Sequence, residues 1–332
     1  MANHPPEPGS VQIVRLGVTM FATDVSMGVP ELALAAEQRG FDSVWIPEHT
    51  HIPTSRVTPP PTGDDELPEE YKRSVDPLVA LAAAAAVTER IHLGTGVLLP
   101  AQRDPIVTAK AVATLQNISG GRFELGIGFG WNRDEAESHG VDFAERRAVS
   151  RDHMLAMRAL WTDEVASYRG DHFQLAPSWS WPKPEVPVPV LLGGGAGPKL
   201  MTQLVEYADG WIPIGGSGLT DAIPEYRRRL EDAGRDPAAA RVVPFGSHPT
   251  AEKLDHFASL GVTECVFRLP RPPRTWCWPN STARPRWSTT FVRVEPCAVW
   301  EIPTTWRRIQ TRHPVSGPAP SRFSAPSWPW CW

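Results

Sequence analysis

A histidine beside a glutamate offers the clearest catalytic chemistry in the sequence. His49 directly follows Glu48, and both come just after the apolar segment 41–47. An imidazole titrates near neutral pH, so His49 can move a proton, and Glu48 can orient or polarise the same site. A histidine at the end of a strand can equally have a structural role. We therefore treat His49 and Glu48 as candidate catalytic residues.

The same segment also suggests a metal site. His49 and His51 are separated by one residue, a spacing at which two imidazoles after a strand can hold zinc. Such a site needs further ligands, and most other segment ends carry glycine instead. His248 is the one additional histidine at a comparable position. We therefore expect no metal.

Glycines gather at the ends of four further apolar segments, at residues 94–96, 126–130, 193–197 and 215–218. Little side-chain bulk fills such positions, so a flat ring system can lie against the backbone there. Residues 193–197 directly precede an expected helix, where free N–H groups suit a phosphate. The alternative for this run is a flexible loop whose glycines serve turn geometry.

Short apolar segments alternate with amphipathic or Ala-rich segments between residues 11 and 269. We expect eight strands, at 11–20, 41–47, 91–99, 122–128, 188–192, 210–214, 241–246 and 262–268. Seven helices lie between them, at 30–39, 77–90, 105–116, 143–161, 198–207, 220–234 and 251–260. This alternation predicts an α/β fold, an eight-stranded parallel (β/α)8 TIM barrel, with a doubly wound open sheet as the alternative. Active sites of such barrels lie at the C-terminal strand ends.

Two long irregular segments interrupt the alternation, at 48–73 and 163–187. Each can form a lid that shapes a substrate pocket, or a packed segment without that role. Trp179 and Trp181 belong to the second segment. We expect these two indoles to line an apolar substrate pocket near the mouth of the barrel.

Composition narrows the classes of partner. Lys and Arg number 33 against 37 Asp and Glu, a net charge of −4, which argues against nucleic acid. The sequence contains no run of about 18 consecutive apolar residues, so we expect no membrane-spanning helix. Residues 1–10 are polar, without an apolar signal-peptide core, so we expect a disordered N-terminus and a cytoplasmic protein.

Residues 270–332 differ from the rest of the chain. They hold eight of the 14 tryptophans and many prolines, with no helical or strand period. An eighth helix is due after 262–268, and an irregular, low-order tail stands in its place. The alternatives are a disordered tail, which is usually poor in aromatic residues, and the product of a frameshift.

Five ordered motifs resemble the luciferase-like monooxygenase superfamily, and more narrowly its branch that uses the deazaflavin coenzyme F420. The motifs cover residues 40–49, 90–97, 119–132, 190–195 and 207–211. The resemblance implies a TIM barrel over 11–269 with the cofactor across its strand ends. It also implies a non-proline cis peptide at Gly96–Val97, a proton-transfer role for His49, and contact between Glu48 and the cofactor ring.

The resemblance further assigns residues to the cofactor. It implies that the cofactor is lined by Gly96, Val97, Gly128, Gly130 and Asn132. It places the phosphate on Gly193, Gly194, Gly195, Ala196 and Gly197. Sugar-phosphate dehydrogenases of the superfamily carry a glutamate where Trp131 stands here. Their two-residue acid/base scheme and their substrate are therefore not supported, and Trp131 is expected to floor an apolar substrate pocket.

These observations predict an oxidoreductase that transfers a hydride between F420 and an unknown small organic substrate. The nearest alternative is an FMN-dependent two-component monooxygenase, which needs a flavin reductase as partner. A second alternative is a non-catalytic cofactor-binding protein or an inactive frameshifted remnant. The nearly neutral surface permits a homodimer.

The frameshift hypothesis is tested by reading the codons of residues 265–300. Read from the third base of each codon, Trp276 to Pro279 encode Val-Leu-Ala whatever synonymous codons are used. We expect the shifted frame to continue with the apolar spacing of an amphipathic helix. A shifted frame crowded with stop codons or charged residues would contradict the hypothesis.

Overall fold

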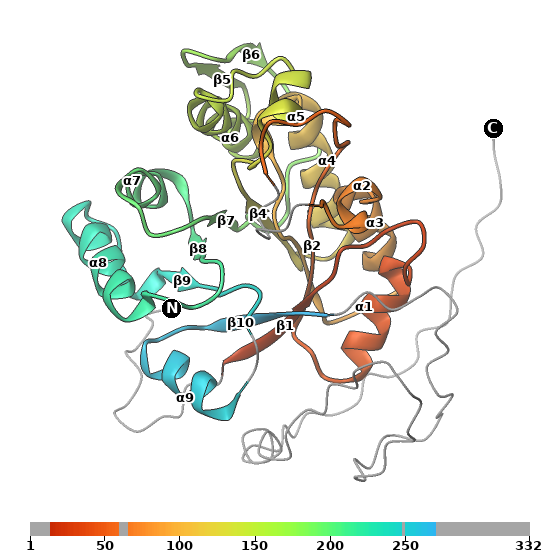
Figure 1. Ribbon diagram of the computed structural model, residues 1–332. Helices are drawn as coiled ribbons and strands as arrows, with labels where there is room; N and C mark the ends of the chain where they lie inside the picture. The colour runs from red at the N-terminus through yellow and green to blue at the C-terminus, as the bar shows by residue number, and fades with distance from the viewer. Residues whose placement is uncertain (1–13, 60–65, 248–249, 270–332) are drawn as a thin grey trace, which may run out of the picture. The chain divides into compact units, whose positions relative to one another are not determined.

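Eight parallel strands form a barrel in the computed structural model, which describes residues 14–59, 66–247 and 250–269 (Figure 1). The strands are β1 (Arg15–Thr19), β2 (Ser43–Ile46), β3 (His92–Thr95), β4 (Phe123–Ile127), β7 (Val190–Gly193), β8 (Gly210–Ile212), β9 (Arg241–Val242) and β10 (Glu264–Arg268). They pair in the order β10-β1-β2-β3-β4-β7-β8-β9. A parallel bridge between Phe245 and Val266 joins the two ends of the sheet. The predicted barrel is thereby confirmed.

Seven helices return the chain from one strand to the next. They are α1 (Val29–Gln38), α3 (Pro77–Ala85), α4 (Pro105–Ile118), α6 (Arg146–Thr162), α7 (Pro198–Tyr207), α8 (Leu219–Asp232) and α9 (Ala251–Ser259). Side-chain caps and prolines stabilise the first turns of several of these helices. Asp76 and Asp104 accept the N–H groups of Val79 and Val107, and a proline follows each cap.

Several smaller elements depart from the sequence-based expectation. The segment 163–187 contains an antiparallel hairpin of β5 (Ala166–Arg169) and β6 (Gln174–Ser178). Two short helices, α2 (Glu69–Lys72) and α5 (Arg133–Ser138), and the 3₁₀ turns η1 (Pro100–Gln102) and η2 (Pro237–Ala239) lie in expected loops. The expectations for residues 1–10 and 270–332, including the frameshift and the missing eighth helix, lie outside the described residues.

A tryptophan occupies the interior of the barrel. Trp45 of β2 is fully buried, and its ring packs edge-on against Phe245 with centroids 5.3 Å apart. A Cβ on Gly94 of β3 would lie 2.1 Å from the Trp45 ring. Gly94 therefore makes room for the indole, which together with Leu191, Val266 and neighbouring side chains fills the central layer of the barrel.

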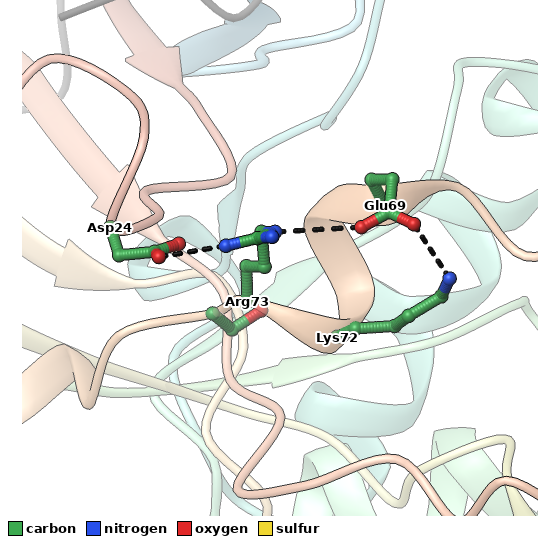
Figure 2. Close-up of a pocket in the computed structure, with 5 residues that line it drawn as sticks. Asp24, Glu69, Lys72 and Arg73 are labelled. Atoms are coloured by element: carbon green, nitrogen blue, oxygen red, sulfur yellow. Dashed lines mark hydrogen bonds and ion pairs between the residues drawn. The ribbon is translucent and has the colours of Figure 1, made fainter.

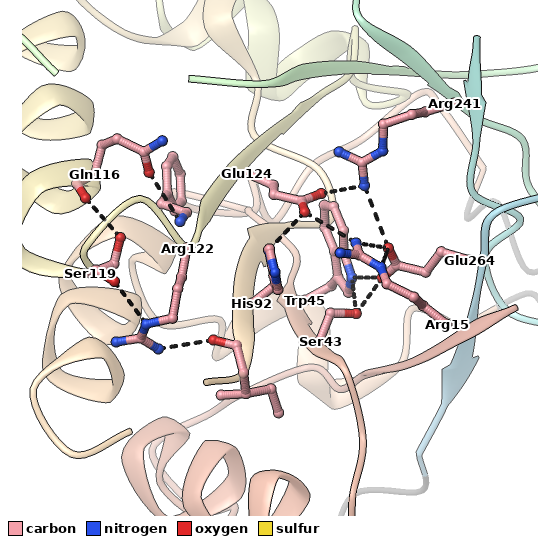
Figure 3. Close-up of polar contacts among 12 residues, drawn as sticks. Arg15, Ser43, Trp45, His92, Gln116, Ser119, Arg122, Glu124, Arg241 and Glu264 are labelled. Carbon is pink, nitrogen blue, oxygen red and sulfur yellow. Dashed lines mark hydrogen bonds and ion pairs between the residues drawn. The ribbon is translucent and has the colours of Figure 1, made fainter. Parts of the chain in front are cut away.

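A charged layer lies below the tryptophan, at the N-terminal ends of the strands (Figure 3). The buried carboxylates of Glu124 and Glu264 are its centre. Arg15 donates to both carboxylates, and Arg241 donates to Glu124 at 2.8 Å. His92 Nδ1 lies 3.0 Å from Glu124 Oε1. These contacts join the starts of β1, β3, β4, β9 and β10, so they fix the strands in register.

The layer is coupled to the hydrophobic interior. The Ser43 hydroxyl donates to Glu264 and accepts the indole N–H of Trp45 at 2.8 Å. The orientation of the central tryptophan is therefore set by the carboxylate beneath it. Arg122 forms a further link between elements. Its guanidinium donates to the carbonyls of Ala85, Thr88 and Ile91 and so connects α3 to β3 and β4.

Glu124→Gln should destabilise the fold and flatten its acid sensitivity. Burial would raise the pKa of Glu124, but the His92 contact and the charges of Arg241 and Arg15 lower it to about 2. A carboxyl with a lowered pKa stabilises the fold above its ordinary pKa of about 4.5, and that contribution disappears as the pH falls toward 2. At neutral pH, leaving the arginines without this partner should cost about 3–5 kcal/mol.

Urea unfolding at pH 7, 4.5 and 3 measures both effects. The wild-type free energy of unfolding should fall more steeply between pH 4.5 and 3 than that of the variant. Glu137→Gln, an exposed change on α5, serves as the control. Parallel pH dependences for wild type and Glu124→Gln would show that the carboxylate is not held ionised.

Candidate functional site

The candidate site is organised around His49, which follows β2 at the C-terminal end of the barrel. The imidazole is only 8% exposed. Its Nδ1 lies 2.8 Å from Oε2 and 3.1 Å from Oε1 of Glu135, which is fully buried on α5. An ionised carboxylate accepts hydrogen bonds only, so this contact favours a proton on Nδ1. The other ring nitrogen, Nε2, is then left for chemistry.

The sequence does not single out Glu135, because the run from Arg133 to Ser138 is polar apart from Ala136. A weak signal exists. Asn132 is the N-cap of α5 and Glu135 is its third residue, the spacing of a capping box. The box is not formed: Asn132 makes no side-chain cap, and Glu135 contacts His49 instead. Asn132 and Glu135, residue types that usually stabilise a helix start, therefore do not cap α5 and are available to the site.

Two aromatic rings enclose the imidazole. Tyr71 lies 5.2 Å and Trp131 5.9 Å from the His49 ring, and the two aromatic rings are 6.0 Å apart. Tyr71 comes from α2 in the segment 48–73, so this segment contributes a wall of the site. The indole N–H of Trp131 is buried without a hydrogen-bond partner among the described residues. The expected role of Trp131 as the floor of an apolar substrate pocket remains a prediction.

Glu48 differs from the expectation drawn from the resemblance. Its Oε1 accepts Arg103 Nε at 2.5 Å, and its Oε2 accepts the N–H of Leu99 at 2.7 Å. Arg103 also donates to Asp76 at the start of α3. Both carboxylate oxygens are therefore bound to η1 and its flanking residues, and Glu48 holds the β3–α4 connection beside the site.

Val97 forms the floor of the barrel mouth. The Gly96–Val97 peptide is cis, as the resemblance implies. A Cβ on Gly128 would lie 2.5 Å from Val97, and one on Gly193 would lie 3.1 Å from it. A Cβ on Gly96 would lie 2.6 Å from the Phe245 ring. Glycine at these three positions leaves room for the side chains of Val97 and Phe245. Val97 itself is half-buried and faces the mouth of the barrel.

The glycine loop before α7 remains open. A Cβ on Gly195 or Gly197 would meet no atom within 4 Å. The loop is anchored at Gly194, whose carbonyl accepts the indole N–H of Trp211 at 2.8 Å and whose N–H donates to the carbonyl of Ile212 at 3.1 Å. Gly195 and Ala196 are exposed directly before the helix. The backbone of this loop can therefore approach a ligand closely.

Buried amides without partners lie near the mouth. Both side-chain atoms of Asn132 lack a hydrogen bond among the described residues, and the side chain is fully buried. The same holds for both atoms of Gln102 on η1, which was not predicted. The Gln102 amide would lie 3.4 Å from a Cβ on Gly130, a residue with φ of +71°. Unpaired buried amides are costly unless a ligand or water satisfies them.

Trp179 and Trp181 do not join this site. They are 76% and 60% exposed, respectively. The carbonyl of Trp181 accepts Lys110 of α4, and the following carbonyl of Lys183 accepts Asn117 near the end of the same helix. The segment therefore runs along the outer helical layer toward β7, so the prediction that these indoles line the mouth is corrected.

The described residues hold no group of three His, Cys, Asp or Glu side chains that could bind a metal ion. His51 is exposed and lies beside His139, with ring centroids 5.3 Å apart. Thr50 Oγ1 lies 2.8 Å from His139 Nε2. His248 falls outside the described residues. No described helix is long and apolar enough to cross a membrane.

A charged pocket of about 410 Å³ lies on the outer side of α2 (Figure 2). Arg73 donates to Asp24 at 2.7 Å and also pairs with Glu69, which Lys72 contacts at 2.7 Å. Its cations are thus neutralised, and His49 does not line it. Its structural effect is to hold α2 in place while Tyr71 points the other way, toward His49.

The family model for luciferase-like monooxygenases matches residues 22–256. The chain therefore belongs to the luciferase-like monooxygenase family. It is 44% identical over 261 residues to an uncharacterized protein of Mycobacterium tuberculosis, covering 76% of this chain and 91% of that protein.

Two further relatives carry descriptive names. An F420-dependent glucose-6-phosphate dehydrogenase of Kineococcus radiotolerans is 34% identical over 233 residues, or 68% of this chain and 64% of that protein. A solved structure of an F420-dependent secondary alcohol dehydrogenase in complex with an F420-acetone adduct is similar with a TM-score of 0.58 and 25% identity. The match covers 70% of this chain and 68% of that chain.

The contact between His49 and Glu135 should be measurable as a coupling free energy. We expect a double-mutant cycle of His49→Ala and Glu135→Gln to give about 1–3 kcal/mol in urea unfolding, because the charge-assisted hydrogen bond is buried. A matched cycle of His49→Ala with Glu137→Gln on the exposed face of α5 should give a value near zero. Equal coupling in both cycles would contradict the pairing.

Proposed function

We propose that this protein is an oxidoreductase that transfers a hydride between coenzyme F420 and a small organic substrate. The observation that carries the proposal is the buried His49–Glu135 pair at the C-terminal end of the barrel. The named relatives that use F420 support the choice of cofactor. FMN is the alternative cofactor, and the same site would then serve oxygen chemistry with a separate reductase.

The residues of the mouth are suited to such a cofactor. A planar ring can lie on Val97, where glycines keep the backbone low. The unpaired amides of Gln102 and Asn132 offer donors and acceptors of the kind that the polar edge of a heterocycle needs. The open loop offers the backbone N–H groups of Gly195 and Ala196 for a phosphate before α7, whereas the N–H of Gly197 donates to the carbonyl of Gly195 at 2.7 Å.

F420, when bound, supplies the two-electron carrier for hydride transfer. The protein supplies the rest. Glu135 holds the His49 ring through Nδ1, which leaves Nε2 as the atom that takes or gives the proton. When the imidazole becomes cationic, the Glu135 carboxylate offsets the new charge. Tyr71 and Trp131 exclude water from the ring and favour an uncharged, partly apolar substrate.

Fluorescence titration of the full chain with F420 and with FMN tests the cofactor. Selective, saturable binding of F420, with turnover in the absence of oxygen, is the expected result. Turnover is assayed with a panel of small uncharged alcohols and carbonyl compounds. Selective binding of FMN with oxygen-dependent turnover would replace the proposal by its alternative, and binding of neither would reject both.

Variants of the pair test the chemistry. His49→Ala should bind F420 within a few-fold of wild type and lose about 10²–10⁴-fold in kcat, because only proton transfer is removed. Glu135→Gln should lower kcat by a smaller factor, since the ring nitrogen keeps a polar neighbour. Glu137→Gln is the matched control on the same helix. Unchanged kcat in His49→Ala would exclude His49 as the proton-transfer group.

A further inference from the structure

Three arginines converge beside the mouth at the starts of α5 and α6, in a cluster that the proposed chemistry does not use. The guanidinium carbons of Arg133 and Arg146 lie 4.8 and 3.7 Å from the centre of the Phe143 ring. That of Arg147 lies 3.9 Å from the centre of the Phe129 ring, at the end of β4. Aromatic stacking holds a cation in place without neutralising its charge.

The cluster has an excess of positive charge. Arg146 donates to the carbonyls of Gly130 at 3.2 Å and Phe143 at 2.6 Å, and Arg147 donates to the amide oxygen of Gln203 at 3.3 Å. Neither has a carboxylate within ion-pair distance among the described residues. Arg133 has only the exposed Glu137, at 3.3 Å. Burial, together with the charges of Arg147 and Arg133, lowers the pKa of Arg146.

Neighbouring arginines show that this state is unusual. On the same helix, one and three turns further along, Arg151 pairs with Glu206 and Arg158 with Asp209. Both of those carboxylates belong to the α7–β8 region. The α6 arginines closest to the mouth are thus the ones left without a counter-charge. An uncompensated cation in a half-buried position is expected where an anionic ligand completes the site.

The cluster is joined to both parts of the proposed cofactor site. Arg146 holds the carbonyl of Gly130, next to the unpaired amides. Arg147 and Gln203 exchange two hydrogen bonds, which tie the start of α6 to α7, the helix that begins at the glycine loop (Figure 1). The arginines therefore contact both the end of β4 and α7, beside the mouth.

We propose that Arg146 and Arg147, with Arg133 at the edge, form a second anion subsite that binds carboxylates of the cofactor tail. The inference rests on the proposed function, in which the first phosphate lies at residues 193–197. FMN ends in a single phosphate and leaves this subsite without a ligand, whereas F420 continues beyond its phosphate into a tail of carboxylates. The subsite therefore gives the protein a means to select the deazaflavin.

The experiment compares F420 carrying its glutamate tail with the same deazaflavin phosphate lacking the glutamates. Wild type should bind the tailed form about 10-fold or more tightly, a factor typical of charge-assisted hydrogen bonds. Arg146→Gln/Arg147→Gln should lose this preference and bind the two forms with similar affinity. Arg147→Gln alone should lose part of the preference, and it leaves the Gly130 contact intact if the double variant folds poorly.

Arg151→Gln removes the same charge from the same helix and is the matched control, which should keep the preference. A wild-type protein that binds both forms equally, or a double variant that keeps the preference, would overturn the subsite. Failure of the proposed function is distinguishable, because then neither form binds. In that case a triglutamate peptide is the probe: it should raise the melting temperature of wild type and not of the double variant, and no shift in either would overturn the subsite as well.

Discussion

The buried contact between two carboxylates and two arginines at the starts of the strands is the constraint on which the barrel depends. Glu124 and Glu264 lie where hydrophobic side chains usually pack, and Arg15 and Arg241 compensate them. Each partner belongs to a different strand, so removing one leaves charge uncompensated in the interior. Through Ser43 the layer also orients Trp45, whose ring requires glycine at position 94. Register, core and mouth are thus connected by one set of contacts.

The opposite end of the barrel follows a different rule. Glycines there leave the backbone uncovered by side chains, and Val97 forms the floor of the mouth. The buried carboxylates at the N-terminal end are paired with arginines, whereas the buried amides of Gln102 and Asn132 near the mouth have no partner among the described residues. This division agrees with the position of active sites in such barrels, where loops at the C-terminal strand ends carry the variable chemistry. Tyr71, Trp131 and Glu135 all come from such loops or the short helices within them.

The sequence predicts elements with strong local signals and misses those fixed by tertiary contacts. Helix α7 has the predicted bounds because a glycine cap, a following proline and an amphipathic period agree. Motifs predict the cis peptide and single out His49. Glu135 lies in a mostly polar run, so only its contact with His49 in the fold identifies it. The orientations of Glu48 and of the tryptophans of 163–187 could not be predicted, because spacing does not show which way a side chain turns. Arg103 and Lys110, distant in sequence, decide those orientations.

The unformed capping box of α5 has a consequence for how the protein can evolve. A helix of six residues gains little from its own hydrogen bonds, and a capped start contributes about 1 kcal/mol. Asn132 and Glu135 forgo that contribution, so α5 depends on His49 and on the segment that binds Asp134 through Val57. Selection for thermal stability alone would return both residues to the helix. Under the proposed function, only selection for the role of His49 keeps these two residues in the site, and α5 is where a stabilised descendant without that role would first differ.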